Sequence, residues 1–196
     1  SASDADGETP TITYEWSDGS TDPEYVIVES DDPGDTITCT ATATDGASET
    51  ASATASATVT NTEPVIDSVT VSPSTGQVSD PLTCEASATD TDGDTPTITY
   101  AWSDGSTDPE YVIVESDDPG DAIVCTVTAV DPHGGSVTDS ASATVTNTEP
   151  VLGSVSISPS TGQVGEPLTC SASASDADGD TLSYSYVWSD GSTDPE

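Results

Sequence analysis

Acidic side chains at alternating positions are the residues of this 196-residue sequence that could do chemistry. Asp90, Asp92 and Asp94 are separated by single residues, with Gly93 between the last two. Carboxylates at alternating positions of a turn can supply several of the roughly six to eight oxygen ligands that calcium prefers. The pattern predicts a calcium-binding loop. The alternative is an ordinary turn, in which the Asp side chains accept hydrogen bonds from local backbone amides.

The same acidic motif occurs at two other places in the chain. Asp176, Asp178 and Asp180 repeat it in full, whereas Asp4 and Asp6 are followed by Glu8 in place of a third Asp. Each copy precedes a segment with alternating aromatic residues, which is typical of a strand. The motif therefore belongs to a repeated unit.

Three tryptophans set the period of that unit, because 102 − 16 = 86 and 188 − 102 = 86. The segment WSDGSTDPEYVIVESDDPGD occupies residues 16–35 and again residues 102–121, and its opening WSDGSTDPE returns at residues 188–196. Self-similarity at a fixed period identifies an array of one unit. An array suits a stalk, spacer or fibre, and no acid–base pair stands outside the repeat, so we expect no enzyme.

The boundaries of the units are predicted at the segment NTEP, at residues 61–64 and 147–150. Proline disfavours helix at the residue before it, which suits a short extended linker. The chain then comprises the C-terminal part of one repeat (1–64), a complete repeat (65–150) and the N-terminal part of the next (151–196). A unit of 86 residues is long enough to be a domain.

Hydrophobic residues within the unit alternate with a period of two. Leu82, Cys84, Ala86 and Ala88 form one such series, and Ile123, Cys125, Val127 and Ala129 another. Turn-forming clusters such as SDGSTDPE separate the series. About seven short strands at this spacing predict an all-β fold of tandem, immunoglobulin-like antiparallel β-sandwiches arranged as beads on a string.

Charge excludes several classes of partner. The sequence has 37 Asp and Glu residues, no Lys or Arg, and a formal charge of −37. Self-repulsion of this size destabilises a compact state unless cations offset it. Nothing in the chain neutralises phosphate, so we expect neither nucleic acid nor an anionic membrane as a partner. No apolar run is long enough to insert into a membrane.

The order of Cys84, Trp102 and Cys125 resembles the immunoglobulin sandwich, in which two cysteines join the sheets and a tryptophan packs on the bridge. The resemblance implies a disulfide between Cys84 and Cys125, worth roughly 4 kcal/mol. Cys39 and Cys170 hold the same two positions in the partial units. Two alternatives remain open: a bond from Cys39 to Cys84 across the linker, and buried free thiols in a cytosolic protein.

The segments ATDTDGDTPTITYAWSDG and ASDADGDTLSYSYVWSDG resemble bacterial PKD-like and cadherin-like tandem repeats. Those families carry a D-x-D-G-D loop before an aromatic strand that ends in Trp, and the resemblance covers essentially the whole chain. It implies secreted or surface-attached, calcium-responsive modules of large adhesins, filaments or multidomain hydrolases.

In such a sandwich, the start of the first strand lies at the same end as the acidic loop and the last loop. We therefore expect Glu63 and Glu149 to approach the acidic loops that follow them, and Asp131 to join the first. The opposite end of the preceding unit offers Asp31 and Asp32, or Asp117 and Asp118. The predicted calcium ligands are Asp4, Asp6, Glu63, Asp90, Asp92, Asp94, Asp131, Glu149, Asp176, Asp178 and Asp180.

Together these features predict a structural repeat of an extracellular surface filament, stalk or giant adhesin, made rigid by calcium at the joints and by disulfides. Its expected partners are neighbouring repeats and identical chains in a filament. The alternative is a ligand- or carbohydrate-binding adhesin module, or a spacer of a secreted hydrolase. His133, the single histidine, is interpreted as a solvated loop residue.

Overall fold

Residues 2–5 and 7–193 are described by a computed structural model, and their regular elements are all β-strands. This confirms the all-β prediction. Among these residues none forms a helix with the length and apolar composition needed to cross a membrane. In the N-terminal part, β1 (Thr11–Trp16), β2 (Thr36–Thr44) and β3 (Thr50–Thr58) form an antiparallel sheet in that order.

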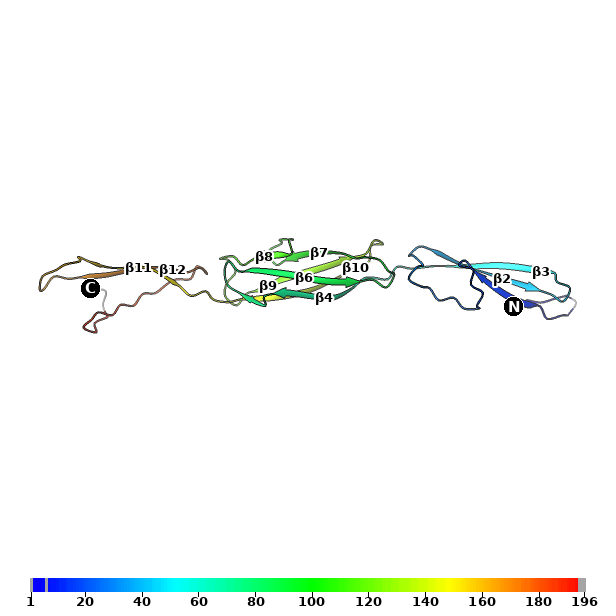
Figure 1. The fold of residues 1–196 in the computed structure, drawn as a ribbon, viewed down its shortest axis with the longest axis horizontal. Coiled ribbons are helices and arrows are strands. Elements are labelled where there is room, and N and C mark those ends of the chain that lie inside the picture. Colours follow the sequence, from blue (N-terminus) through cyan, green and yellow to red (C-terminus); the bar gives the residue numbers. More distant parts are fainter. Residues whose placement is uncertain (1, 6, 194–196) are drawn as a thin grey trace. The chain divides into compact units, whose positions relative to one another are not determined.

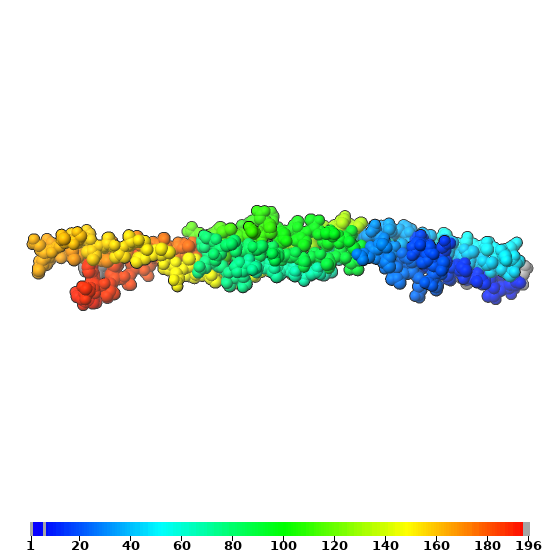
Figure 2. Space-filling model, in the orientation of Figure 1, coloured from blue at the N-terminus to red at the C-terminus, as the bar shows by residue number. Residues whose placement is uncertain are grey.

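Seven further strands form two sheets, which we call the central sandwich. One sheet has the order β4-β6-β8 and the other the order β5-β10-β9-β7, with β5 parallel to β10. The strands are β4 (Val65–Ser72), β5 (Thr75–Gly76), β6 (Pro81–Thr89), β7 (Thr97–Trp102), β8 (Glu110–Val112), β9 (Ala122–Val130) and β10 (Ser136–Val145). Figure 1 labels most of these strands, and the residues of this part are mostly green in the space-filling view of Figure 2.

The core of the central sandwich is built around a disulfide. Cys84 on β6 is bonded to Cys125 on β9, which joins the two sheets. Leu82 and Val127, on the same strands, have no exposed surface. Trp102 is 3% exposed, and its indole Nε1 donates a hydrogen bond to the Asp108 carbonyl oxygen at 2.8 Å. The alternating residues of the sequence therefore face one apolar interior.

The C-terminal part has one two-stranded antiparallel sheet, of β11 (Val151–Ser158) and β12 (Thr169–Ser175). The register shifts between Leu152 and Ser154, where Gly153 lies. These strands occupy the sequence positions of β4 and β6 one period later, whereas β1, β2 and β3 occupy those of β7, β9 and β10 one period earlier. The N-terminal and C-terminal parts thus form strands at the positions of different strands of the central sandwich.

Two compact units divide the described chain. The first comprises Ser1–Asp67, Ser87–Ile98 and Thr128–Thr138, and the second comprises Ser68–Ala86, Thr99–Val127 and Asp139–Glu196. The first unit contains one acidic loop together with the linker that precedes it. The second contains the disulfide, and also the next linker and acidic loop. Each unit therefore carries its own candidate site.

Candidate metal site at the acidic loops

The acidic loop of the first unit follows β6 and turns at Gly93, whose φ of +85° only glycine adopts readily. Asp90 Oδ1 accepts a hydrogen bond from the Asp92 amide at 2.8 Å, as in an Asx turn. The turn uses one oxygen of Asp90 and leaves Asp90 Oδ2 buried without a hydrogen-bond partner. The turn interpretation therefore holds for one oxygen of this carboxylate, and the other oxygen is buried without a donor.

The linker is tied to this loop through the middle aspartate. The Thr62 amide donates to Asp92 Oδ2 at 2.6 Å, and the Thr62 hydroxyl donates to Asp92 Oδ1 at 2.9 Å. In the second unit, Thr148 makes the same two bonds to Asp178, again at 2.6 and 2.9 Å. Two charge-assisted bonds to one carboxylate fix direction as well as distance. The contact is thus a repeated feature of the unit.

Asp131 belongs to the candidate site of the first unit and lies in the loop between β9 and β10. It is 5% exposed and accepts hydrogen bonds from Asn61 Nδ2 and from the amides of His133 and Gly135 at 2.8–2.9 Å. The Asn61 side chain, together with these backbone amides, holds the pKa of Asp131 below its ordinary value despite burial. Asp131 is therefore anionic at neutral pH.

Three buried oxygen atoms near this wall have no hydrogen-bond donor: Asn61 Oδ1, Asp90 Oδ2 and Asp94 Oδ2. His133 Nε2 lies 3.4 Å from Asp94 Oδ2, without the geometry of a hydrogen bond. Burying such oxygens without a partner is costly, and native structures usually satisfy them with a donor, water or an ion. Their chemistry fits a hard cation such as calcium.

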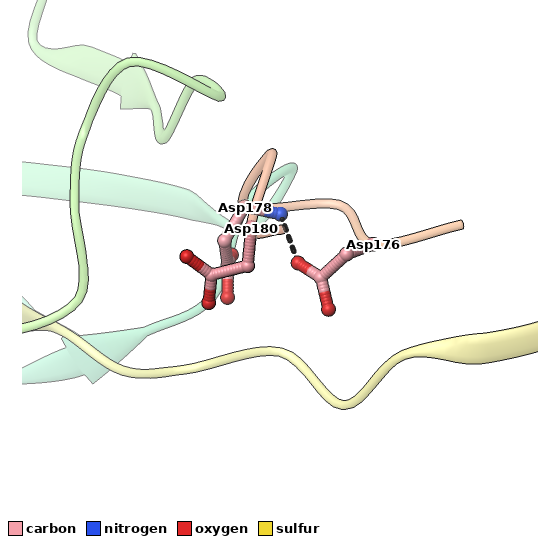
Figure 3. A group of neighbouring side chains, drawn as sticks. All are labelled: Asp176, Asp178 and Asp180. Atoms are coloured by element: carbon pink, nitrogen blue, oxygen red, sulfur yellow. Dashed lines mark hydrogen bonds between the residues drawn. The ribbon is translucent and has the colours of Figure 1, made fainter. Parts of the chain in front are cut away.

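The acidic loop of the second unit has the tighter arrangement of carboxylates. Asp176, Asp178 and Asp180 each offer one oxygen, and these oxygens lie within 4.8 Å of one another. Figure 3 shows Asp178 and Asp180 side by side, with the Asp176 carboxylate facing them and accepting a hydrogen bond from the Asp178 amide at 2.9 Å. Asp178 is 6% exposed. Carboxylates this close repel each other unless a cation lies between them.

The remaining predicted calcium ligands are more exposed than Asp131 and Asp178 or lie outside the described residues. Glu63 and Glu149 are exposed, and their neighbours Thr62 and Thr148 make the hydrogen bonds to the loops instead. Asp4 is half-buried, whereas Asp6 lies outside the described residues. Glu8, in the place of the third aspartate, accepts a hydrogen bond from the Gly46 amide at 3.1 Å.

A glutamate that the sequence did not single out lies beside each acidic loop: Glu29 beside the first and Glu115 beside the second. A Cβ atom at Gly93 would lie 2.7 Å from Glu29 Cγ, and one at Gly179 would lie 3.0 Å from Glu115 Oε1. Glu29 and Glu115 occupy the same position of the identical 20-residue segments. A signal was present, since 93 − 29 and 179 − 115 both equal 64. Sequence alone did not show which acid of the segment reaches the loop.

The neighbouring aspartates of that segment have a different role. Asp117 Oδ2 accepts hydrogen bonds from the Tyr111 hydroxyl at 2.8 Å and from the Val114 amide at 2.9 Å. Asp31 makes the equivalent bonds with Tyr25 and Val28. Local donors therefore bond to Asp31 and Asp117, whereas Glu29 and Glu115 lie beside the acidic loops.

Tyr111 gives a prediction for alkaline pH. Burial, and then the hydrogen bond to Asp117, raise the pKa of Tyr111 from 10.0 to about 12. The unfolded chain therefore loses this proton first, and stability falls as pH rises from about 10 to about 12. We expect Tyr111→Phe to flatten the fall in melting temperature over this range. Tyr184→Phe, at a side chain 45% exposed, should leave it unchanged; equal slopes for Tyr111→Phe and the wild type would contradict the assignment.

Comparisons with known proteins give the following. No protein-family model matches the chain, and no curated protein matches it either. Among solved structures, the chain is similar to the protocadherin gammaB4 extracellular domain, with a TM-score of 0.36 and 14% identity over 93% of this chain and 37% of that one. It is also similar to PcdhgB3 EC1-4, with a TM-score of 0.35 and 13% identity over 86% of this chain. The chain spans 37% and 51% of the lengths of these two structures.

Proposed function

We propose that this chain is a structural repeat array of an extracellular surface filament, stalk or giant adhesin, in which calcium at the acidic loops fixes each linker to the sandwich that follows. The observation that carries this proposal is the repeated linker contact. Thr62 binds Asp92, and Thr148 binds Asp178, through the same atoms at the same distances. The contact recurs at both linkers and holds each one against the acidic loop that follows it in the sequence.

Calcium suits the three buried oxygens of the first site that accept no hydrogen bond. Asn61 Oδ1, Asp90 Oδ2 and Asp94 Oδ2 lack donors, and calcium accepts amide and carboxylate oxygens in flexible geometry. Glu29 lies beside the same loop. A chain of charge −37 has no Lys or Arg to offset these carboxylates. A bound divalent ion supplies that charge.

The disulfide supports an extracellular location. The bond between Cys84 and Cys125 persists in oxidising compartments and is rare in the cytosol. Residues 65–150 would then be one repeat of the array, since its strands run from Val65 to Val145. Neighbouring repeats, and identical chains in a filament, are the proposed partners.

The test is calcium binding by the whole chain. Thermal unfolding of the chelated protein is followed as calcium is added, with calorimetry to measure binding directly. At a free calcium concentration of about 100 times Kd, binding to the native state adds about 2.7 kcal/mol to the free energy of unfolding. We expect Asp94→Asn to weaken this gain, because it removes one of the donor-less carboxylates.

Glu85→Gln is the matched control, since it removes the same charge from an exposed position of β6. It should bind calcium as the wild type does. An unchanged melting temperature with calcium, or equal calcium affinity of the Asp94→Asn and wild-type chains, would contradict the proposal. Magnesium at the same concentration separates specific binding from general screening of charge.

A further inference from the structure

The strand β3 has one edge without a partner. It pairs with β2 on one side, and no other strand of the described residues pairs with it. The Val59 amide, directly after β3, donates toward the β2 side, to the Asp35 carbonyl oxygen at 2.9 Å. Alternate residues of an antiparallel strand bond to opposite sides, so the amides of Ser52, Thr54 and Ser56 point to the open side. A row of unpaired backbone groups is a template for a further strand.

The complete repeat has the same open edge, so the edge does not depend on where the sequence begins. β10 is the equivalent of β3 one period later, and only its last two residues, Thr144 and Val145, pair with β5. Residues 136–143 have no strand on that side, although all seven strands of the central sandwich are described. An open edge along most of this strand is therefore a property of the repeat.

The two copies of this edge differ in charge. In β10, the exposed Asp139 accepts a hydrogen bond from the Ser140 amide at 2.8 Å. That amide points to the open side, like the Thr144 amide, which donates to the Ser74 carbonyl oxygen next to β5. A charged residue on an edge strand opposes pairing with another chain. In β3 the equivalent residue is Ala53, and residues 50–62 contain neither Asp nor Glu.

We propose that the open edge of β3 pairs antiparallel with the same edge of a second copy of this chain, so that one sheet continues across both molecules. A second copy is assigned because an antiparallel edge is complementary to itself under two-fold symmetry. Charge points to the same partner, since two chains of charge −37 repel each other except where their surfaces carry no carboxylates. The inference rests on the proposed function only for its setting, a lateral contact within a filament, and it does not require calcium.

The register of the pair follows from the residues whose amides point outward. Pairing centred on Thr54 places Ser52 of one copy opposite Ser56 of the other, and Thr54 opposite Thr54. Each of these residues then exchanges an N–H and a C=O with its opposite residue. β3 has the sequence TASATASAT, so no large side chain obstructs the approach. The nearest acid, Glu49, lies outside the paired residues 50–58.

The experiment uses the whole chain, with Cys39 and Cys170 replaced by alanine so that these free thiols form no bonds. It is done at near-physiological ionic strength, which screens repulsion between the acidic copies. Sedimentation is expected to show a dimer whose fraction rises with concentration, with calcium and with a chelator alike. Amide hydrogen exchange is expected to slow at Ser52, Thr54 and Ser56 as the dimer forms, but not at the equivalent positions of β10. Loss of the dimer and loss of calcium binding are therefore separate results.

Two substitutions on β3 test the contact in different ways. Ala53→Asp introduces the residue that β10 has at this position, and it should abolish the dimer because it brings like charges together across the strands. Its matched control is Ala47→Asp, in the exposed loop between β2 and β3, which should dimerise as the unchanged chain does. Thr54→Pro removes one outward amide without adding charge and should also abolish the dimer. Its matched control is Ser140→Pro, on the edge that Asp139 protects.

A variant that gains an edge keeps the test decisive if either β3 variant fails to fold, as circular dichroism would show. Asp139→Ala removes the charge from β10, and it is expected to give masses above that of the dimer because each chain then has two open edges without charge. Monomers at every concentration, or dimers in which the outward amides of β3 exchange as fast as in the monomer, would overturn the proposal. Dimers that persist in folded Ala53→Asp and Thr54→Pro chains, or Asp139→Ala chains that stop at the dimer, would overturn it as well.

Discussion

Replacement of both Cys84 and Cys125 with alanine is expected to lower the free energy of unfolding of the central sandwich by about 4 kcal/mol. The bond closes a loop of 41 residues between β6 and β9, and so restricts the unfolded chain. It also joins two sheets whose interior has small residues such as Ala129 and Ala143. A core of this composition offers less apolar area than one of Leu and Phe, so the bond is a large share of a typical stability of about 5–15 kcal/mol.

The measurement is urea unfolding of dilute protein, followed by the fluorescence of Trp102 in a chain with phenylalanine at positions 16 and 188. The control replaces Cys39 and Cys170 with alanine. These thiols are free and only partly buried, so the expected change is below about 0.5 kcal/mol, as for most surface substitutions. Equal losses in the two double variants would show that the Cys84–Cys125 bond contributes no more than the side chains themselves.

Leu82→Ala is expected to cost about 2–5 kcal/mol, the second large effect. Leu82 has no exposed surface and lies in the apolar interior between β6 and β9. Truncation there removes buried apolar surface and leaves a cavity. The matched substitution is Leu168→Ala, at the same position of the repeat in the C-terminal part, where the side chain is only partly buried. Its effect on the unfolding of dilute protein should be small.

The same urea experiment measures this pair, with Val112→Ala as an additional control at a side chain 53% exposed. Equal losses for Leu168→Ala and Leu82→Ala would contradict the assignment of the cost to complete burial.

Much of the fold follows from local regularities of the sequence. The alternation of Ile123, Cys125, Val127 and Ala129 predicts one buried face of a strand, and all four are at most 4% exposed. Backbone geometry alone imposes that alternation, because successive side chains of a strand point to opposite sides. The turns are equally local: Gly105 has a φ of +90° within the repeated segment WSDGS, and its equivalents Gly19 and Gly191 do the same.

Only part of the candidate site can be predicted from residues that are close together in the sequence. The loop of Asp90, Asp92 and Asp94 could be identified from its spacing, and so could its repetition at residues 176–180. In the linker, the sequence favoured a charged residue, Glu63, and did not single out Thr62, which makes the hydrogen bonds to Asp92. A hydroxyl and an amide satisfy a carboxylate without adding charge, whereas a glutamate would increase the repulsion.

The sequence by itself determined the period, the all-β class, the positions of the acidic loops and the equivalence of the cysteines, because each of these depends on residue type and spacing along one chain. Only the tertiary structure decided which acid meets which loop. Glu115 lies against Gly179, while Asp117, two residues later, is held by Tyr111. Side chains two positions apart differ little in sequence pattern, but the strand or turn that carries them decides which groups they reach. That choice depends on how distant segments come together, which spacing along the chain does not encode.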